Sequence, residues 1–298
     1  MTLQQLRYFL AVVENGSLSK AAETMFVSQP SLTAAIRKLE EEYHITFFRR
    51  TNKGVILSHE GEEFLGYVRQ ILLQVNALES KYADEQEIQR DFSVSSQHLH
   101  FANNAFINLL QKYDHQKYRF NLIETSTYNV IENVSTMVSE IGVMGYSDFS
   151  REFLFEIFER KNLEFHELAV VPGRIFVAEG HPLLKYRTVR YEDLYDYPCI
   201  IYDQGEHNAL YLPESSPRLL NHPKRIHITD RGTSFQLMHS MNAFASDTGI
   251  TVEYNEFPSI EIDPPEERYV GYIAHKNMVL SDHAVSYIEE LRNCAGAE

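Results

Sequence analysis

One stretch near the N-terminus constrains this chain more than any other: residues 27–54 read VSQPSLTAAIRKLEEEYHITFFRRTNKG. Five Lys or Arg lie within it, although the formal net charge of the whole chain is −15. Ser28 is a favourable helix N-cap, and Pro30 falls in the first turn, where a missing N–H costs little. The stretch therefore predicts a helix with a defined start, followed by a cation-rich turn.

Two shorter helices precede this one. Apolar residues recur at helical spacing from Leu3 to Val13 and stop at the turn signal Asn15-Gly16, after which Ser17 can cap a second helix. One face of the third helix is apolar and must pack on the first two. The other face is small near its start and cationic further along, at Arg37 and Lys38. Such a face suits a recognition helix, because small residues approach base edges while longer cations reach phosphates.

A β-hairpin follows the third helix, because apolar runs flank Arg49-Arg50-Thr51-Asn52-Lys53-Gly54. We predict a wing with three cations at its tip. Alone, such a hairpin is more often a solvated loop, and three helices are often only a packing module, but their conjunction in this order is more specific. Residues 1–58 hold seven Lys or Arg against five Glu. This excess favours a polyanion partner for the head, although chance variation among solvated faces also accounts for it.

The run SLSKAAETMFVSQPSLTAAIRKLEEEYHITFFRRTNKGVILSHEG resembles the winged helix-turn-helix of LysR-type transcriptional regulators. The shared pattern is an Ala-Ala pair, a Ser-Gln-Pro helix start, a Leu-Glu helix end and an Arg-Thr-x-x-Gly wing. Ala34 departs from it, since many members have a cation there, and so does Arg49, which is commonly acidic in relatives. The resemblance implies base reading by Gln29, Pro30 and Thr33. The DNA-binding residues that it implies are Ser28, Gln29, Pro30, Ser31, Thr33, Arg37, Lys38, Arg50, Thr51 and Lys53.

A heptad seam follows the wing. From His59 to about Ala83 apolar residues alternate at spacings of 4 and 3, which predicts a helix of about 37 Å whose single stripe needs a partner. Docking onto the chain's own body is one alternative. The unbroken alternation and the resemblance favour dimerisation, so that two heads reach the half-sites of a pseudo-palindromic operator; the resemblance also implies a tetramer. The predicted dimerisation residues are Phe64, Val68, Ile71, Val75, Leu78 and Tyr82.

Alternating strand and helix patterns beyond residue 91 predict a parallel α/β body. The LysR resemblance implies that two crossovers join two lobes in a periplasmic-binding-protein-like arrangement. The fold class is then α/β with a head dominated by helices. We expect a winged head at 1–58, a linker helix at 59–87, and an effector-binding domain at 88–298 with lobe I at 88–165 and 269–298 and lobe II at 166–268. Predicted strands lie at 92–95, 118–124, 141–146, 169–171, 174–178, 199–202, 225–229 and 269–275, and predicted helices at 99–112, 130–138 and 281–292.

Polar residues follow the predicted strands of both lobes, where helix N-termini present free N–H groups. Hydroxyls and amides in such a cleft suit a small polar metabolite, for example one with a carboxylate. The competing interpretation is that these Ser and Thr only cap helices. The predicted effector-binding residues are Ser95, Ser96, Gln97, His98, Thr125, Ser126, Thr127, Gly145, Tyr146, Tyr202, Asp203 and Thr229.

Several classes of site are disfavoured. The sequence has no Walker loop and no GxGxxG, GxSxG or HExxH pattern, so we expect neither an enzyme nor a cofactor. His98 and His100 alternate rather than converge, which argues against a metal. Cys199 and Cys294 lie 95 residues apart, which argues against a redox pair. A chain without ~18 consecutive apolar residues or a basic leader is expected to be cytoplasmic, with no membrane partner.

The sequence thus predicts a DNA-binding transcriptional regulator whose operator binding is modulated by a small-molecule effector. RNA polymerase is a further candidate partner. The alternatives are a two-lobed small-molecule-binding protein, or an enzyme, with an N-terminal interaction module.

Overall fold

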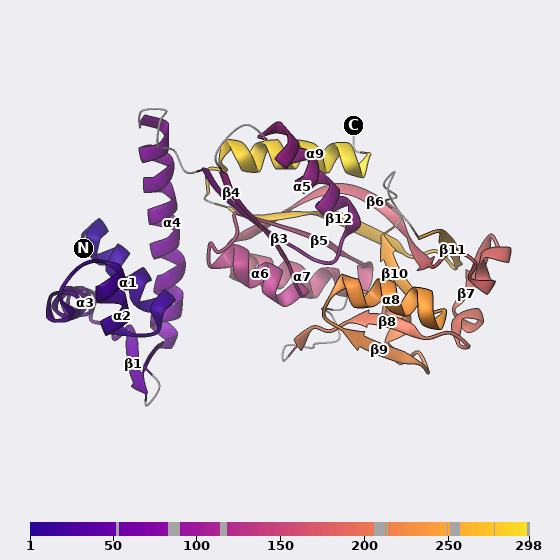
Figure 1. Ribbon diagram of the computed structural model, residues 1–298, viewed down its shortest axis with the longest axis horizontal. Helices are drawn as coiled ribbons and strands as arrows, with labels where there is room; N and C mark the ends of the chain where they lie inside the picture. Colours follow the sequence, from indigo (N-terminus) through magenta and orange to yellow (C-terminus); the bar gives the residue numbers. More distant parts are fainter. Residues whose placement is uncertain are drawn as a thin grey trace. The chain divides into compact units, whose positions relative to one another are not determined.

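The computed structural model describes residues 1–51, 54–82, 90–113, 118–205, 212, 214–248, 250, 257–276 and 278–296. The chain divides into two compact units, Met1–Ile88 and Gln89–Glu298 (Figure 1). Each unit has its own core and is considered by itself. No helix in the described part of the chain is both long enough and apolar enough to cross a membrane.

The first unit contains α1 (Leu3–Asn15), α2 (Leu18–Thr24), α3 (Gln29–Tyr43), β1 (Phe48–Thr51), β2 (Gly54–Leu57) and α4 (His59–Tyr82). Thr2, Ser17 and Ser28 cap α1, α2 and α3, each accepting a hydrogen bond from a backbone N–H of the first turn. Three helices and an antiparallel hairpin in this order confirm the predicted winged helix-turn-helix.

The wing is tied to the turn between α1 and α2. Val55 donates its backbone N–H to the Gly16 carbonyl at 3.0 Å. Gly54 has a φ of 138°, and a Cβ on it would lie 2.4 Å from that same oxygen, so only glycine fits here. Arg49 and Arg50 lie within β1 rather than at the tip, which corrects the predicted three-cation tip. Lys53 lies outside the described residues.

The core of the first unit includes part of the predicted dimerisation seam. Phe64 stacks on Phe47 with ring centroids 4.4 Å apart, and Phe9 packs edge-on against both rings. Val68 is fully buried in this core, where Ile71 also packs. A side chain with no exposed surface cannot contact a partner, so the dimerisation prediction is wrong for Val68. This half of the seam packs on the helices and wing of the head, a partner that neither the dimerisation prediction nor its alternative named.

The second unit is built on a ten-stranded sheet. Eight strands follow the order β4-β3-β5-β12-β6-β10-β8-β9, β11 also pairs with β6, and β7 pairs with β11. Its first lobe contains β3 (Arg90–Ser96), α5 (His100–Lys112), β4 (Tyr118–Glu124), α6 (Thr127–Ser135), β5 (Ile141–Tyr146), α7 (Asp148–Arg160), β12 (Glu267–His275) and α9 (Asp282–Ala295). β3 pairs in parallel with β4 and β5, as predicted. Helices α5 and α9 cover one face of this sheet and α6 and α7 the other (Figure 1).

The second lobe contains the later part of β6 (Leu163–Val177), β7 (Thr188–Arg190), β8 (Cys199–Tyr202), β9 (Arg225–Ile228), α8 (Arg231–Met241), β10 (Phe244–Thr248) and β11 (Ser259–Asp263). Short 3-10 helices cover Pro182–Lys185, Tyr191–Leu194 and Pro217–Asn221. One core lies on each face of its sheet, and α8 packs over the second of them.

The chain passes from lobe I to lobe II within strand β6 and returns between β11 and β12. β6 pairs with β12 from Leu163 to Pro172 and then with β10 and β11 from Gly173 onwards. The change of lobe therefore falls between Pro172 and Gly173, not at the predicted residue 166. The two strands predicted at 169–171 and 174–178 are one strand. It tolerates Pro172, which lacks an N–H, because this residue lies where the partner strand changes.

Candidate functional site

The N-terminal end of α3 presents a polar, accessible surface. The Ser28 hydroxyl accepts a hydrogen bond from the backbone N–H of Ser31 at 3.3 Å, and Gln29, Pro30 and Ser31 are exposed. The Gln29 amide oxygen accepts a hydrogen bond from Ser19 at 3.0 Å, which orients the side chain. The opposite face of α3 is buried through its Leu and Ile residues. The first turn is therefore free to approach a partner closely.

Cations continue this surface along α3. Arg37 and Lys38 are exposed, and neither forms an ion pair with any residue that the structure describes. Thr33 is half-buried beside them, and Arg49 is exposed on β1. The side chains of Arg50 and Thr51 lie outside the description. Small polar groups ahead of unpaired cations can read base edges while the cations hold phosphates.

Phe26 was missed by the sequence analysis. It lies in the turn before Ser28, with a φ of 53° and 95% of its surface exposed. A left-handed conformation is uncommon for a bulky residue, and full exposure of a phenyl ring is unfavourable. No periodic pattern marks this position, so only the structure could find it.

In the second unit, His98 connects the two lobes. Its backbone N–H donates to Glu214 Oε2 at 2.9 Å, and its Nδ1 lies 3.0 Å from the same oxygen. Its ring stacks on Tyr202. Burial alone would lower the pKa of His98, but the hydrogen bond and charge of Glu214, helped by Glu124, raise it above its usual value. The imidazole therefore favours the charged form in this contact.

Two further contacts close the lobes at the same edge. Thr127 donates its backbone N–H to Gln204 Oε1 at 2.9 Å. Arg231, the first residue of α8, forms an ion pair with Glu124 at the end of β4. Protein side chains thus occupy much of the edge where the strands end.

A cavity remains between the lobes, with about 650 Å³ of empty space that includes space open to solvent. Of the twelve predicted effector-binding residues, only Gln97, His98, Gly145 and Tyr202 line it. The residues that do not line it are Ser95, Ser96, Thr125, Ser126, Thr127, Tyr146, Asp203 and Thr229.

Seven of these eight residues have hydrogen-bond or stacking partners within the protein. The Ser95 and Ser96 side chains are fully buried within lobe I, where Ser95 contacts Ser139. Ser126 caps α6, as the competing interpretation expected. The Tyr146 ring stacks on another tyrosine ring inside lobe I. Thr229 is exposed.

Residues that the sequence analysis missed supply most of the cavity wall. The polar ones are His100, Ser234, Ser246, Asp247, Thr248 and Arg268, and the apolar ones include Phe176, Phe235, Met238 and Phe257. Many of them come from α8 and β10, which we did not predict, and Arg268 fell at a predicted boundary. The sequence showed only an Arg next to a predicted strand, and its burial became evident in the structure.

Metal and redox sites find no support in the geometry. Within the described residues, no group of three His, Cys, Asp or Glu is placed to hold a metal. Burial lowers the pKa of His100 to about 3, so this imidazole is neutral at physiological pH. Cys199 is buried, which raises the pKa of its thiol to about 12. A thiol of that pKa is a poor nucleophile at neutral pH.

Comparison with known proteins decides the family. Residues 3–62 match the family described as "Bacterial regulatory helix-turn-helix protein, lysR family". The chain is also 23% identical to YbhD, an HTH-type transcriptional regulator of Escherichia coli, over 98% of this chain and 91% of the relative. The chain belongs to the LysR family. It is a DNA-binding transcriptional regulator, and its relatives are regulators rather than enzymes.

Solved structures share the fold of this LysR-type regulator. Full-length OxyR of Pseudomonas aeruginosa superimposes with a TM-score of 0.67 over 100% of both chains at 16% identity. The regulator CbnR in complex with its target DNA superimposes with a TM-score of 0.57 at 17% identity, over 99% of this chain and 100% of that one. These likenesses extend over the head, the linker helix and both lobes.

Proposed function

We propose that this LysR-type regulator binds a pseudo-palindromic operator and that a small polar metabolite in the inter-lobe cavity changes that binding. The observation that carries the proposal is the position of the cavity. Groups from both lobes line it, and three polar contacts hold the lobes together beside it. A ligand there changes the regulator only if its affinity differs between two lobe arrangements.

For the DNA half of the proposal, α3 supplies the reading surface. Gln29 suits adenine, since its amide pairs a donor with an acceptor, and Thr33 offers a methyl and a hydroxyl. Arg37, Lys38 and the wing bind the phosphate backbone. The DNA complex of CbnR, a protein of the same fold, supports this placement.

Assembly through α4 gives the proposed operator its symmetry. Tyr67 and Leu78 are 62% and 60% exposed on this helix, an unfavourable state for large apolar side chains in a lone chain. A two-fold dimer would cover Leu78 and present two heads to two half-sites. We propose that two dimers then form a tetramer.

The cellular setting follows from the target. The regulator acts in the cytoplasm, where the chromosome of a bacterium lies, and needs no cofactor other than its effector. Contact with RNA polymerase would connect operator occupancy to transcription.

The test uses full-length protein. Metabolites are first screened by thermal shift, and each compound that stabilises the protein is added to a footprinting experiment on a selected operator. We expect at least one compound to change the footprint. If the protein binds DNA sequence-specifically and no stabilising compound changes the footprint, it is a constitutive DNA-binding protein and the proposed effector control is wrong.

A further inference from the structure

Arg268 is a buried cation without a counter-charge. It lies at the start of β12, only 5% exposed, and its side chain lines the inter-lobe cavity. Its guanidinium forms no hydrogen bond or ion pair with any described residue. Gly173 lies beside it: a Cβ there would be 3.6 Å from Arg268 Nε, an ordinary contact distance. Burial lowers the pKa of Arg268, and the nearby acidic groups do not offset this. An anion in the cavity would stabilise this charge.

Asp247 is the complementary case. It lies on β10 and lines the same cavity, and its carboxylate accepts a hydrogen bond from the Thr248 backbone N–H at 2.6 Å. No Lys, Arg or His among the described residues forms an ion pair with it. Burial raises the pKa of Asp247 to about 6, although Thr248, Arg231 and Arg268 act in the opposite direction. The carboxylate is therefore ionised at neutral pH but poorly compensated.

The other charged side chains around the cavity already have partners. Glu214 binds His98, Glu124 pairs with Arg231, and Glu266 pairs with Arg218 at 3.4 Å. His100 is neutral, as described above. Arg268 and Asp247 influence one another's pKa but do not form an ion pair with each other. The cavity wall therefore carries one uncompensated cation and one uncompensated anion.

This pairing selects the ligand class. A simple carboxylate would pair with Arg268 but would bring a second negative charge towards Asp247. A simple amine would pair with Asp247 but would bring a second positive charge towards Arg268. A molecule that carries both charges satisfies both side chains. Because Arg268 lies on a strand of lobe I and Asp247 on a strand of lobe II, such a molecule would also bridge the lobes.

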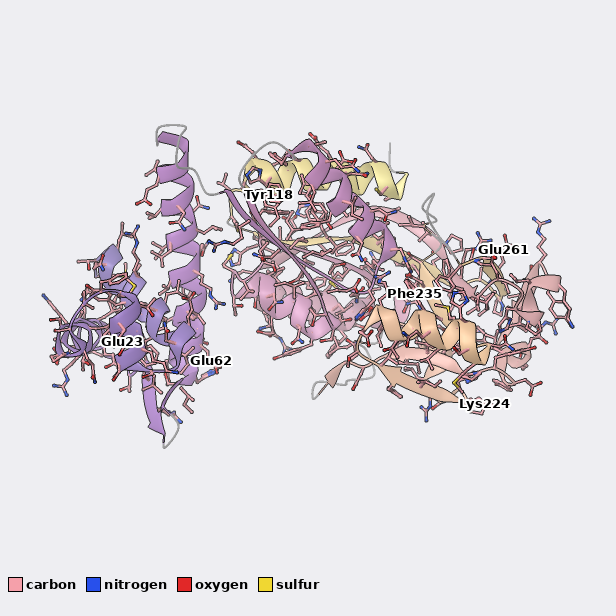
Figure 2. All side chains as sticks on the ribbon, in the orientation of Figure 1. Glu23, Glu62, Tyr118, Lys224, Phe235 and Glu261 are labelled. Atoms are coloured by element: carbon pink, nitrogen blue, oxygen red, sulfur yellow. The ribbon has the colours of Figure 1, made fainter. Side chains whose placement is uncertain are left out.

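The apolar part of the cavity wall indicates the chemistry of the rest of the ligand. Phe176, Phe235, Met238 and Phe257 line the cavity. Phe235 comes from α8 and lies where the two lobes meet (Figure 2). Its ring packs against Phe257 with centroids 4.8 Å apart. Such a wall favours an apolar substituent over a second charged one.

We propose that the inter-lobe cavity binds an α-amino acid with an apolar side chain, whose carboxylate pairs with Arg268 and whose ammonium group pairs with Asp247. The inference rests on the proposed function, since it names the ligand of the same cavity. The apolar side chain contacts the phenylalanine wall.

Titration calorimetry on full-length protein tests the proposal, with the apolar L-amino acids as probes. We expect at least one of them, such as L-phenylalanine, to bind. Its analogues that lack one charge, 3-phenylpropionate and phenethylamine for L-phenylalanine, should bind at least about tenfold more weakly, because each leaves one buried charge unpaired. If no apolar amino acid binds, or if 3-phenylpropionate binds as tightly as L-phenylalanine, the proposal is wrong.

Two variants assign the charges. Asp247→Asn should abolish the preference for the amino acid over its deaminated analogue, whereas Arg268→Gln should weaken both. The exposed Asp196→Asn serves as the matched control and should bind like wild type. Circular dichroism and operator binding verify folding, and the equally neutral Arg268→Met replaces Arg268→Gln if the latter unfolds. Unchanged selectivity in folded Asp247→Asn would exclude the ammonium contact.

The outcomes also separate this inference from the function on which it rests. A compound of another class that changes the footprint, while no apolar amino acid binds, would uphold effector control and overturn the amino-acid site. An amino acid that binds with the expected selectivity but leaves the footprint unchanged would uphold the site and overturn its control of DNA binding.

Discussion

The imidazole ring of His98 lies flat on the phenol ring of Tyr202, with centroids 3.7 Å apart and 3° between the ring planes. The two residues belong to different lobes, and Glu214 holds the imidazole from the side with oxygens 3.0 and 3.1 Å from Nδ1. Burial strengthens such a contact, because the competing water is absent. One of the three polar contacts between the lobes therefore depends on a titratable side chain.

The first prediction concerns Glu214→Gln. The folded pKa of His98 is raised, so the stabilisation is complete below the unfolded value of about 6.5 and is lost as the pH rises through the folded value. The variant should cost about 1–3 kcal/mol of unfolding free energy at pH 5.5 and less at pH 9. Urea unfolding followed by circular dichroism measures both.

The control for this variant is Glu156→Gln, which removes an exposed pair with Arg160 on α7. It should change stability little at either pH. An equal loss at pH 5.5 and pH 9 for Glu214→Gln would contradict a charged His98.

Asp247→Asn should stabilise the ligand-free protein. The folded pKa of about 6 lies above the unfolded value, so wild type loses stability as the pH rises from about 4 to 6, and the amide does not. We expect a gain of about 1–3 kcal/mol at pH 7.5 that is absent at pH 3.5. Asp196→Asn, in an exposed loop, provides the baseline. A less stable variant at pH 7.5 would show that the carboxylate has a partner in solution.

Gly54→Ala tests the attachment of the wing. A Cβ at Gly54 would meet the Gly16 carbonyl, so the wing must move away from the turn after α1. Gly16→Ala is the control: its φ of 59° lies in the left-handed region, which is uncommon for alanine but less restricted than the φ of 138° at Gly54, and the space around it is open. We expect the control to lose about 1 kcal/mol and Gly54→Ala to lose more. Thermal unfolding of the two variants checks the order.

The sequence predicted the head far better than the cleft, for a physical reason. Caps such as Ser28 and a turn glycine such as Gly54 act on their own neighbours, so local patterns locate them. The cavity depends on how β10 and β12 are placed beside β6, and no local pattern encodes that placement. Asp247 illustrates the difficulty, because the strand that carries it, FASDT, has no regular alternation of apolar residues.

Local signals also misled where one pattern serves two purposes. The heptad seam of α4 was interpreted as an interface along its whole length, yet Val68 is buried in its own unit and Leu78 is exposed. A 3-4 spacing shows which face of a helix is apolar, but not which part of the chain or which partner covers that face. Likewise, Ser126 lies at a strand-to-helix junction and only caps a helix.

Two variants of α3 should separate base reading from phosphate binding. Gln29→Ala should lose discrimination between operator and scrambled DNA, because it removes a base contact. Lys38→Ala should weaken both DNAs about equally and reduce the slope of log K against log salt by about 1. Arg160→Ala, exposed on α7, is the control. If Gln29→Ala retains full discrimination, the base-reading surface lies elsewhere on the head.

Leu78→Arg tests whether the exposed end of α4 is the dimer interface. A charge placed in an apolar interface is buried without a partner in both copies, so the dimer should weaken by at least about tenfold in Kd. Operator affinity should fall with it, because one head alone contacts one half-site. Gln74→Arg introduces the same charge at another exposed position of α4 outside the predicted seam and should leave both quantities near wild type. Analytical ultracentrifugation over a concentration series measures the dimer, and an unchanged dimer in Leu78→Arg would assign the interface to another surface.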